Sequence, residues 1–192
     1  MQKRKYVFSA LFAALISIGC VIAIPLPGGV PVTVQNMFSI LAGAILGSFY
    51  GAVSVLIWLT IGAVGIPVFA NAHGGIAIIL GPTGGYMLGY ALASLFLGLM
   101  LGKPNLTENK KDIKFLAKIA VFSLLAYALV YLPGIPWFMH VMAGKGKPVS
   151  FTAALKLTFI PFIPGDLIKW LVTIPLSAAI RPVAARYLES EN

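Results

Sequence analysis

The sequence predicts an all-α protein that crosses a membrane several times. Of the 192 residues, 59% are hydrophobic and only 10% are charged, whereas soluble domains carry about 25% charged residues. Residues 6–102 contain no Asp, Glu, Lys or Arg, and one membrane helix needs only about 20 apolar residues. We therefore expect residues 1–192 to form a single transmembrane domain surrounded by the lipid bilayer.

Six apolar runs are interpreted as membrane helices, and prolines or glycines end several of them. The first run follows Lys3-Arg4-Lys5 and is longer than the roughly 7–15-residue apolar core of a signal peptide, so we interpret it as an uncleaved membrane helix. Pro133-Gly134 is expected to end the fifth span. The six predicted spans are Tyr6–Ile24, Thr33–Gly47, Tyr50–Val64, Gly84–Leu101, Ile113–Leu132 and Pro164–Tyr187.

The connections differ in composition. Residues 68–83 are rich in glycine, and residues 102–112 form the most polar connection. Residues 133–163 are too apolar for a free loop, so we expect residues 151–159 to form a short helix against the bundle.

The basic residues predict the orientation. The net charge is +9, and cytoplasmic loops of membrane proteins collect Lys and Arg. If both termini face the cytoplasm, ten of the fourteen basic residues lie at cytoplasmic span ends. This favours an N-in, C-in protein in the plasma membrane. Since the charges lie at span ends and not on an aromatic-rich face, nucleic-acid binding is not expected.

Small residues recur at helical spacing and predict close helix contacts. Gly43, Gly47 and Gly51 form one ladder, and glycines 81, 85 and 89 form another; both are interpreted as internal packing. Ala10 and Ala14 have the same spacing on the first helix. For these two alanines, docking to another membrane protein is an alternative to internal packing.

Asp166 is the acidic residue that lies in strongly apolar sequence, and Lys169 follows it by three positions. Pro164 favours a helix start at this point, which places Asp166 in the first turn and Lys169 on the same face. A capped helix with an internal ion pair is one interpretation. Because a charge near the bilayer centre costs roughly 2.5–3.5 kcal/mol or more, a ligand-binding role is favoured.

The glycine-rich connection supplies a second group of candidates. It ends at a predicted helix start, where free N–H groups of Gly84 and Gly85 can hold an acceptor. Asn71 and Thr83 in this connection, with Tyr86 in the first turn of the following span, are the polar groups able to contribute. The phosphate-binding pattern GxxxxGK[ST] is absent. The connection has two open interpretations. It contacts a ligand, or it is a tight turn that needs glycine only for its geometry.

Two amides and two histidines complete the polar set. Gln35 and Asn36 lie near the outer end of the second span and need partners, either a neighbouring helix or a ligand. His73 and His140 have no matching ligand cluster, so no metal site or cofactor is expected. The sequence also lacks a serine–histidine–acid arrangement. A membrane-embedded enzyme that uses Asp166 as an acid or base is a further alternative.

These motifs, in this order, resemble the BioY family, the biotin-specific S components of energy-coupling-factor (ECF) transporters. The resemblance covers the whole chain and is carried by five segments. They are Val30-Pro-Val-Thr-Val-Gln35, Gly65-Ile-Pro-Val-Phe-Ala70, Gly74-Gly75, Gly81-Pro-Thr-Gly-Gly-Tyr86 and Pro161-Phe-Ile-Pro-Gly-Asp-Leu-Ile-Lys169.

The resemblance implies a six-helix membrane subunit that binds biotin from outside and has no enzyme activity of its own. It implies a transmembrane coupling subunit and two cytoplasmic ATPases as partners, with Ala10 and Ala14 facing the coupling subunit. It makes Asp166, Lys169, Asn71, Gln35, Thr83, Gly84, Gly85 and Tyr86 the candidate substrate-binding residues. A stand-alone secondary transporter, with Asp166 carrying a proton, is the alternative.

Overall fold

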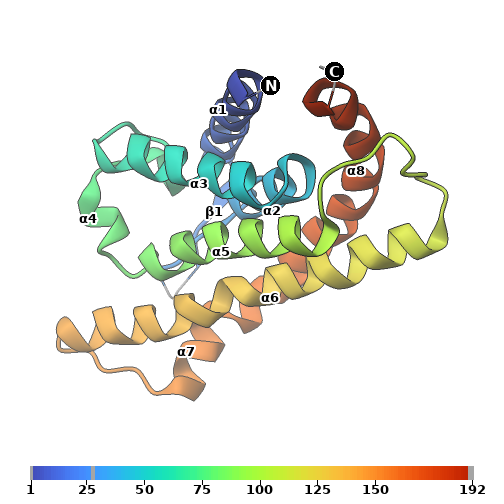
Figure 1. Ribbon diagram of the computed structural model, residues 1–192. Coiled ribbons are helices and arrows are strands. Elements are labelled where there is room, and N and C mark those ends of the chain that lie inside the picture. Colours follow the sequence, from blue (N-terminus) through green and yellow to red (C-terminus); the bar gives the residue numbers. More distant parts are fainter. Residues whose placement is uncertain (1, 27–28, 190–192) are drawn as a thin grey trace.

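The computed structural model describes residues 2–26 and 29–189, which form a helical bundle with one short hairpin (Figure 1). The elements follow one another along the chain as α1 (Gln2–Ile18), β1 (Ala23–Ile24), β2 (Val32–Thr33), α2 (Gln35–Leu46), α3 (Ser48–Ala63), η1 (Ala70–Ala72), α4 (Ile76–Ile79), α5 (Gly84–Leu101), α6 (Ile113–Gly144), α7 (Phe151–Thr158), η2 (Ile160–Phe162) and α8 (Ile163–Glu189).

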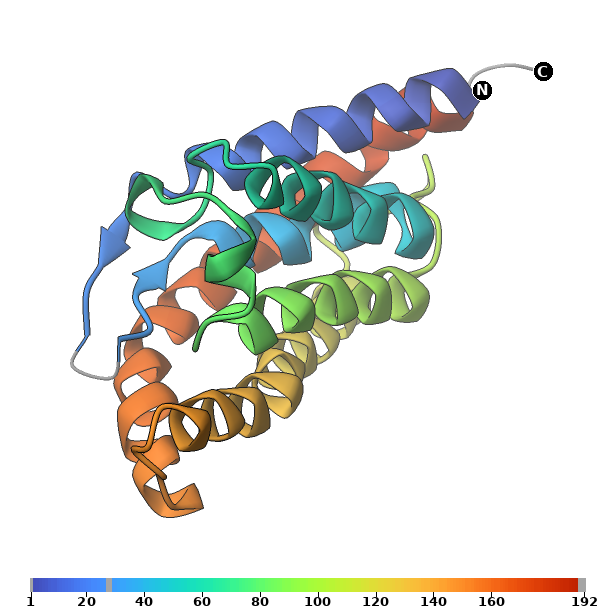
Figure 2. The same ribbon diagram turned by 90° about the vertical axis from the view of Figure 1, so that its left-hand side faces the viewer.

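The long helices run between two ends of the bundle (Figure 2). The start of α1, the end of α8 and the connection between α5 and α6 lie at one end. The β1–β2 hairpin, α4 and α7 lie toward the other. The predicted connections thus separate into two groups in space.

Three helical segments among the described residues are long and apolar enough to cross a membrane: Gly84–Leu101, Ile113–Gly144 and Phe151–Leu188. α2 and α3 are apolar but shorter, with 12 and 16 residues. At about 1.5 Å per residue, α2 spans about 18 Å, less than the roughly 30 Å of a bilayer's apolar core. The structure therefore agrees with a multi-pass membrane protein.

Two predicted span ends are wrong. The first helix ends at Ile18 and not at Ile24, because residues 23–24 pair with residues 32–33 in an antiparallel hairpin. The β-branched residues Val21, Ile22 and Ile24 suit an extended backbone. The carbonyl of Ile16 near the helix end accepts a hydrogen bond from the Gln35 amide nitrogen at 3.0 Å.

The fifth helix does not end at Pro133-Gly134. α6 continues through Pro133 and Pro136 to Gly144. Proline removes a helical hydrogen bond, but the helix is held here by its packing on α5. A Cβ on Gly85 would lie 2.6 Å from the Pro133 carbonyl oxygen, and a Cβ on Gly134 would lie 2.4 Å from the Tyr86 ring. This close packing of α6 on α5 holds the residues around Pro133 in the helix.

Two other predicted elements are confirmed. α5 has the predicted bounds, and α7 is the short helix expected within residues 151–159. The glycine ladders pack internally as predicted, since a Cβ on Gly43 would lie 2.0 Å from the Ser94 carbonyl oxygen of α5. Gly47 adopts a φ of +81°, which ends α2 and begins α3 without a loop.

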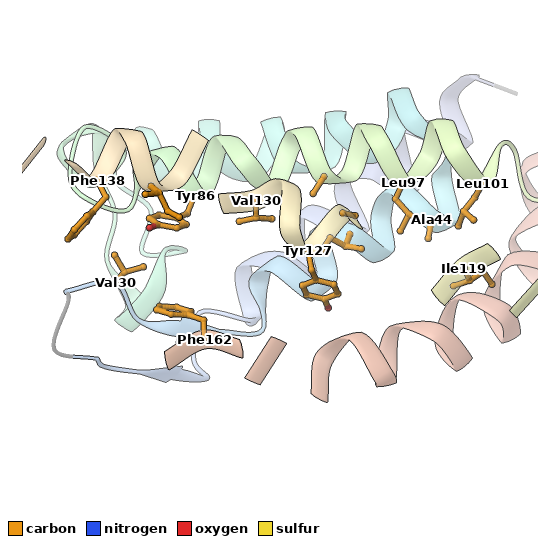
Figure 3. Packing of buried hydrophobic residues seen from close by; sticks show 14 of the residues in the cluster. Val30, Ala44, Tyr86, Leu97, Leu101, Ile119, Tyr127, Val130, Phe138 and Phe162 are labelled. Carbon is orange, nitrogen blue, oxygen red and sulfur yellow. The ribbon is translucent and has the colours of Figure 1, made fainter. Parts of the chain in front are cut away.

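The largest group of buried apolar side chains joins α2, α5, α6 and α8. Figure 3 shows that it extends along the bundle, from Val30, Tyr86 and Phe162 at one end to Leu97, Leu101 and Ile119 at the other. The first of these ends is the one that carries the candidate site.

Candidate functional site

The start of α8 carries the ion pair predicted from the sequence. Pro164 and Gly165 precede Asp166, and a Cβ on Gly165 would lie 3.4 Å from the Val32 side chain, an ordinary van der Waals distance. The start of α8 therefore packs against the β2 strand. Asp166 lies where the helix dipole stabilises a negative charge.

Asp166 and Lys169 are paired inside the bundle. The Lys169 Nζ lies 2.6 Å from Asp166 Oδ1, and the two side chains are only 8% and 12% exposed for Lys169 and Asp166, respectively. Both groups have further partners, so the pair is part of a network and not an isolated contact.

The network draws on three other elements. Asn36 of α2 donates from Nδ2 to Asp166 Oδ1 at 3.0 Å, and Tyr131 of α6 donates from its hydroxyl to Asp166 Oδ2 at 2.5 Å. Lys169 Nζ donates to Asn36 Oδ1 at 2.9 Å and to the Thr33 carbonyl of β2 at 3.0 Å. Charged groups buried away from water need ion-pair and hydrogen-bond partners of this kind.

A cavity of about 340 Å³ lies on the other side of Thr33. This volume falls within the ~300–1,000 Å³ of small-molecule sites. Its walls come from the segment after the hairpin turn, the connection from η1 to α5, the start of α5 and the end of α6. The lining residues are Gly29, Val30, Pro31, Thr33, Gln35, Ala70, Asn71, His73, Ala77, Ile78, Gly81, Pro82, Thr83, Tyr86, Met87, Tyr90 and Lys145.

Four of the eight residues predicted to bind substrate line this cavity: Gln35, Asn71, Thr83 and Tyr86. Gln35 also braces the fold, because its amide nitrogen donates to the carbonyls of Ile16 and Val68 at 3.0 and 2.8 Å. Asn71 has a φ of +59°, a left-handed conformation that asparagine tolerates better than most residues.

Gly84 and Gly85 serve packing in this structure. A Cβ on Gly84 would lie 1.7 Å from the Ile79 carbonyl oxygen, and one on Gly85 would lie 2.3 Å from Trp137 Cβ. Neither glycine lines the cavity. Between the two interpretations of the glycine-rich connection, the geometry of these two positions favours the tight turn.

Asp166 and Lys169 do not line the 340 Å³ cavity. Lys169 contacts one of its lining residues, because Lys169 Nζ donates to the Thr33 carbonyl. Asp166 lines a second, almost wholly apolar cavity of about 390 Å³ between α6 and α8, together with Tyr131 and Phe159. The ion pair therefore contacts lining residues of both cavities.

Sequence reasoning missed the role of Tyr131 and left Asn36 out of the candidate residues. The two residues lie far from Asp166 along the chain, on separate helices, and only packing brings them together. An available signal was that each is a polar residue near one end of an apolar run.

Ala10 and Ala14 lie on one exposed face of α1. Val7, Leu11 and Ile18 on the same helix are also exposed, at 67%, 54% and 65%. The two alanines therefore do not pack inside this chain.

No described group of three or more His, Cys, Asp or Glu side chains could hold a metal ion. The arrangement instead suits an uncharged or singly charged organic ligand, because apolar walls alternate with single amide, hydroxyl and ammonium groups.

Fold and site together define a class: a helical membrane protein with a small-molecule site at one end of its bundle. The chain belongs to the BioY family, whose model matches residues 1–186.

Similar proteins agree with this assignment. The chain is 39% identical to the probable biotin transporter BioY of Pyrococcus horikoshii, over 88% of this chain and 91% of that protein. It is 38% identical to the biotin transporter BioY of Rhodobacter capsulatus, over 90% of both. A crystal structure of the S-component for biotin from an ECF-type ABC transporter matches with a TM-score of 0.76 and 28% identity, covering 94% of this chain and 92% of that one.

Proposed function

We propose that this protein is the biotin-binding membrane subunit, or S component, of an ATP-driven ECF uptake transporter. The observation that carries the proposal is the buried network of Asp166, Lys169, Asn36 and Tyr131 beside a cavity of ligand size. Family membership supports biotin as the ligand. ATP hydrolysis then belongs to separate partner subunits.

Biotin fits the chemistry of this end of the bundle. Its ureido head carries two N–H donors and one carbonyl acceptor, its thioether ring is apolar, and its tail ends in a carboxylate. In the proposed complex the ureido head reaches past Thr33, so that the Asp166 carboxylate accepts one of its N–H groups, while Tyr86 and the side chain of Thr33 offer a hydroxyl each. Gln35, Asn71 and Thr83 are the remaining polar groups of the proposed site.

The proposed topology has six membrane helices, α1, α2, α3, α5, α6 and α8, with both termini in the cytoplasm. Two observations support it: the described ends of the chain lie at the same end of the bundle (Figure 2), and so does the polar connection of residues 102–112. The cavity lies toward the opposite end, which then faces outward. This topology makes residues 1–192 one domain in the plasma membrane.

The exposed face of α1 is the proposed contact with the transmembrane coupling subunit. Ala10 and Ala14 leave a shallow strip among larger apolar side chains. Small residues at this spacing let two helix backbones approach closely in a membrane. The coupling subunit and its two ATPases are the partners that this proposal requires.

Replacing Asp166 tests the proposal. Asp166→Asn removes the charge but keeps the shape, and we expect biotin affinity to fall by more than tenfold, which corresponds to about 1.4 kcal/mol. Titration calorimetry on purified protein in detergent measures the affinity for biotin.

Glu108→Gln is the matched control, because it neutralises the other buried carboxylate, at the far end of α8. It should leave biotin affinity unchanged in the folded protein. Unchanged affinity in Asp166→Asn, or equal losses in both variants, would contradict the assignment.

A further inference from the structure

Lys169 has no capacity left for a ligand carboxylate. An ammonium group has three N–H donors, and Lys169 Nζ already has three acceptors at 2.6–3.0 Å: Asp166 Oδ1, Asn36 Oδ1 and the Thr33 carbonyl. The residue is only 6% exposed. A second carboxylate at this position would have to displace one of these partners and enter a wall that is already packed.

Lys169 does not line the 340 Å³ cavity, but Lys145 does. Of the described residues that line it, Lys145 alone is a Lys or Arg, and none is an Asp or Glu. A carboxylate that enters the cavity therefore meets one fixed positive charge and no acidic side chain among these lining residues. The other charged groups of the site, Asp166 and Lys169, neutralise each other behind Thr33.

Lys145 is a lining residue of the cavity that is also exposed to the surroundings. Its backbone N–H donates to the carbonyls of Val141 and Met142, both at 3.2 Å, so the last turn of α6 fixes its position. The side chain itself is exposed. The negative end of the α6 dipole favours a cation there, and the ammonium group keeps its hydration until a ligand arrives.

We propose that Lys145 recognises the carboxylate of the ligand at the mouth of the cavity. The ligand then enters with its uncharged ring system foremost, toward Thr33 and Tyr86, and its anionic tail stays at the end of α6. This inference rests on the proposed function and adds to it a selectivity for ligands with an ionised tail over neutral analogues.

The test compares biotin with biotinamide, in which a neutral carboxamide replaces the carboxylate. Wild-type protein should bind biotin about fivefold more tightly, the factor for about 1 kcal/mol at an exposed ion pair. Lys145→Gln should lose about this factor for biotin and nothing for biotinamide. Lys147→Gln is the matched control, since Lys147 is exposed, two residues away, and does not line the cavity.

A second measurement needs no variant. The preference of the wild-type protein for biotin over biotinamide should shrink as salt is raised, because salt screens exposed charges. The inference is wrong if wild-type protein binds both ligands equally, or if Lys145→Gln weakens both to the same extent. Wild-type protein that binds neither ligand would instead refute biotin binding itself.

Discussion

At the residue scale, the ion pair is defined by its neighbours more than by its sequence spacing. Asp166 and Lys169 alone would form an ordinary intrahelical pair. Asn36 contacts both partners, as it donates to Asp166 and accepts from Lys169. Tyr131 supplies the fourth group from α6. Helices α2, α6 and α8 are therefore tied together at the same point where the ligand is proposed to bind.

Tyr131→Phe measures how much the Tyr131 hydroxyl contributes to the stability of the protein. Removing a hydrogen bond to a charged group costs about 1.5–3 kcal/mol, so we expect the variant to unfold at lower temperature in detergent. Tyr187→Phe is the control, because Tyr187 is 56% exposed and should show no change. Equal melting temperatures for Tyr131→Phe and wild-type protein would mean that the hydroxyl contributes nothing to stability.

At the element scale, small residues decide how closely the helices approach. Gly43 of α2 contacts both Ser94 of α5 and Gly51 of α3, so three helices meet at one backbone position. The spacing of the glycines predicted internal packing. Which helices meet could not be read from it, because an i, i+4 ladder defines a face and not the partner of that face.

Gly43→Ala tests this contact. The added Cβ would lie 2.0 Å from the Ser94 carbonyl oxygen, and overpacking of this kind costs about 1–3 kcal/mol. We expect a lower midpoint in a thermal or denaturant unfolding experiment in detergent. Gly144→Ala is the control at the end of α6, where a Cβ meets nothing within 4 Å; it should be neutral or slightly stabilising.

At the scale of the whole molecule, one buried arginine joins the end of the bundle opposite the site. Arg181 of α8 is 0% exposed and binds Glu108, with Nη2 at 2.5 Å from Oε1 and Nε at 2.9 Å from Oε2. It also donates to the carbonyls of Ala44, Gly102 and Lys103. It therefore caps the ends of α2 and α5 and holds the polar connection against α8.

Glu108→Gln should destabilise the whole bundle. Breaking a buried ion pair costs about 3–5 kcal/mol when a charge is left unpaired, and the backbone carbonyls that still accept from Arg181 should reduce this to about 2–3 kcal/mol. The unfolding midpoint in detergent reports the loss, with Lys110→Gln as a surface-charge control, because Lys110 is exposed in the same connection. A variant as stable as the wild type would show that the carbonyls alone satisfy Arg181.

The sequence by itself determined the membrane class, most of the helices and the placement of Asp166 and Lys169 on one face of the last helix. These features depend on local composition. Long apolar runs are stable in a bilayer, and a charged residue inside such a run is costly unless it has a partner or a function.

Only the tertiary structure decided the length of α6, the hairpin after α1, the partners Asn36 and Tyr131, and the pairing of Arg181 with Glu108. Each of these depends on contacts between residues far apart in the chain. α6 passes two prolines because α5 lies against it, and Glu108 is drawn from a polar connection into a buried pair because Arg181 needs a counter-charge. The local sequence pattern around a residue does not show which distant residue will pack against it.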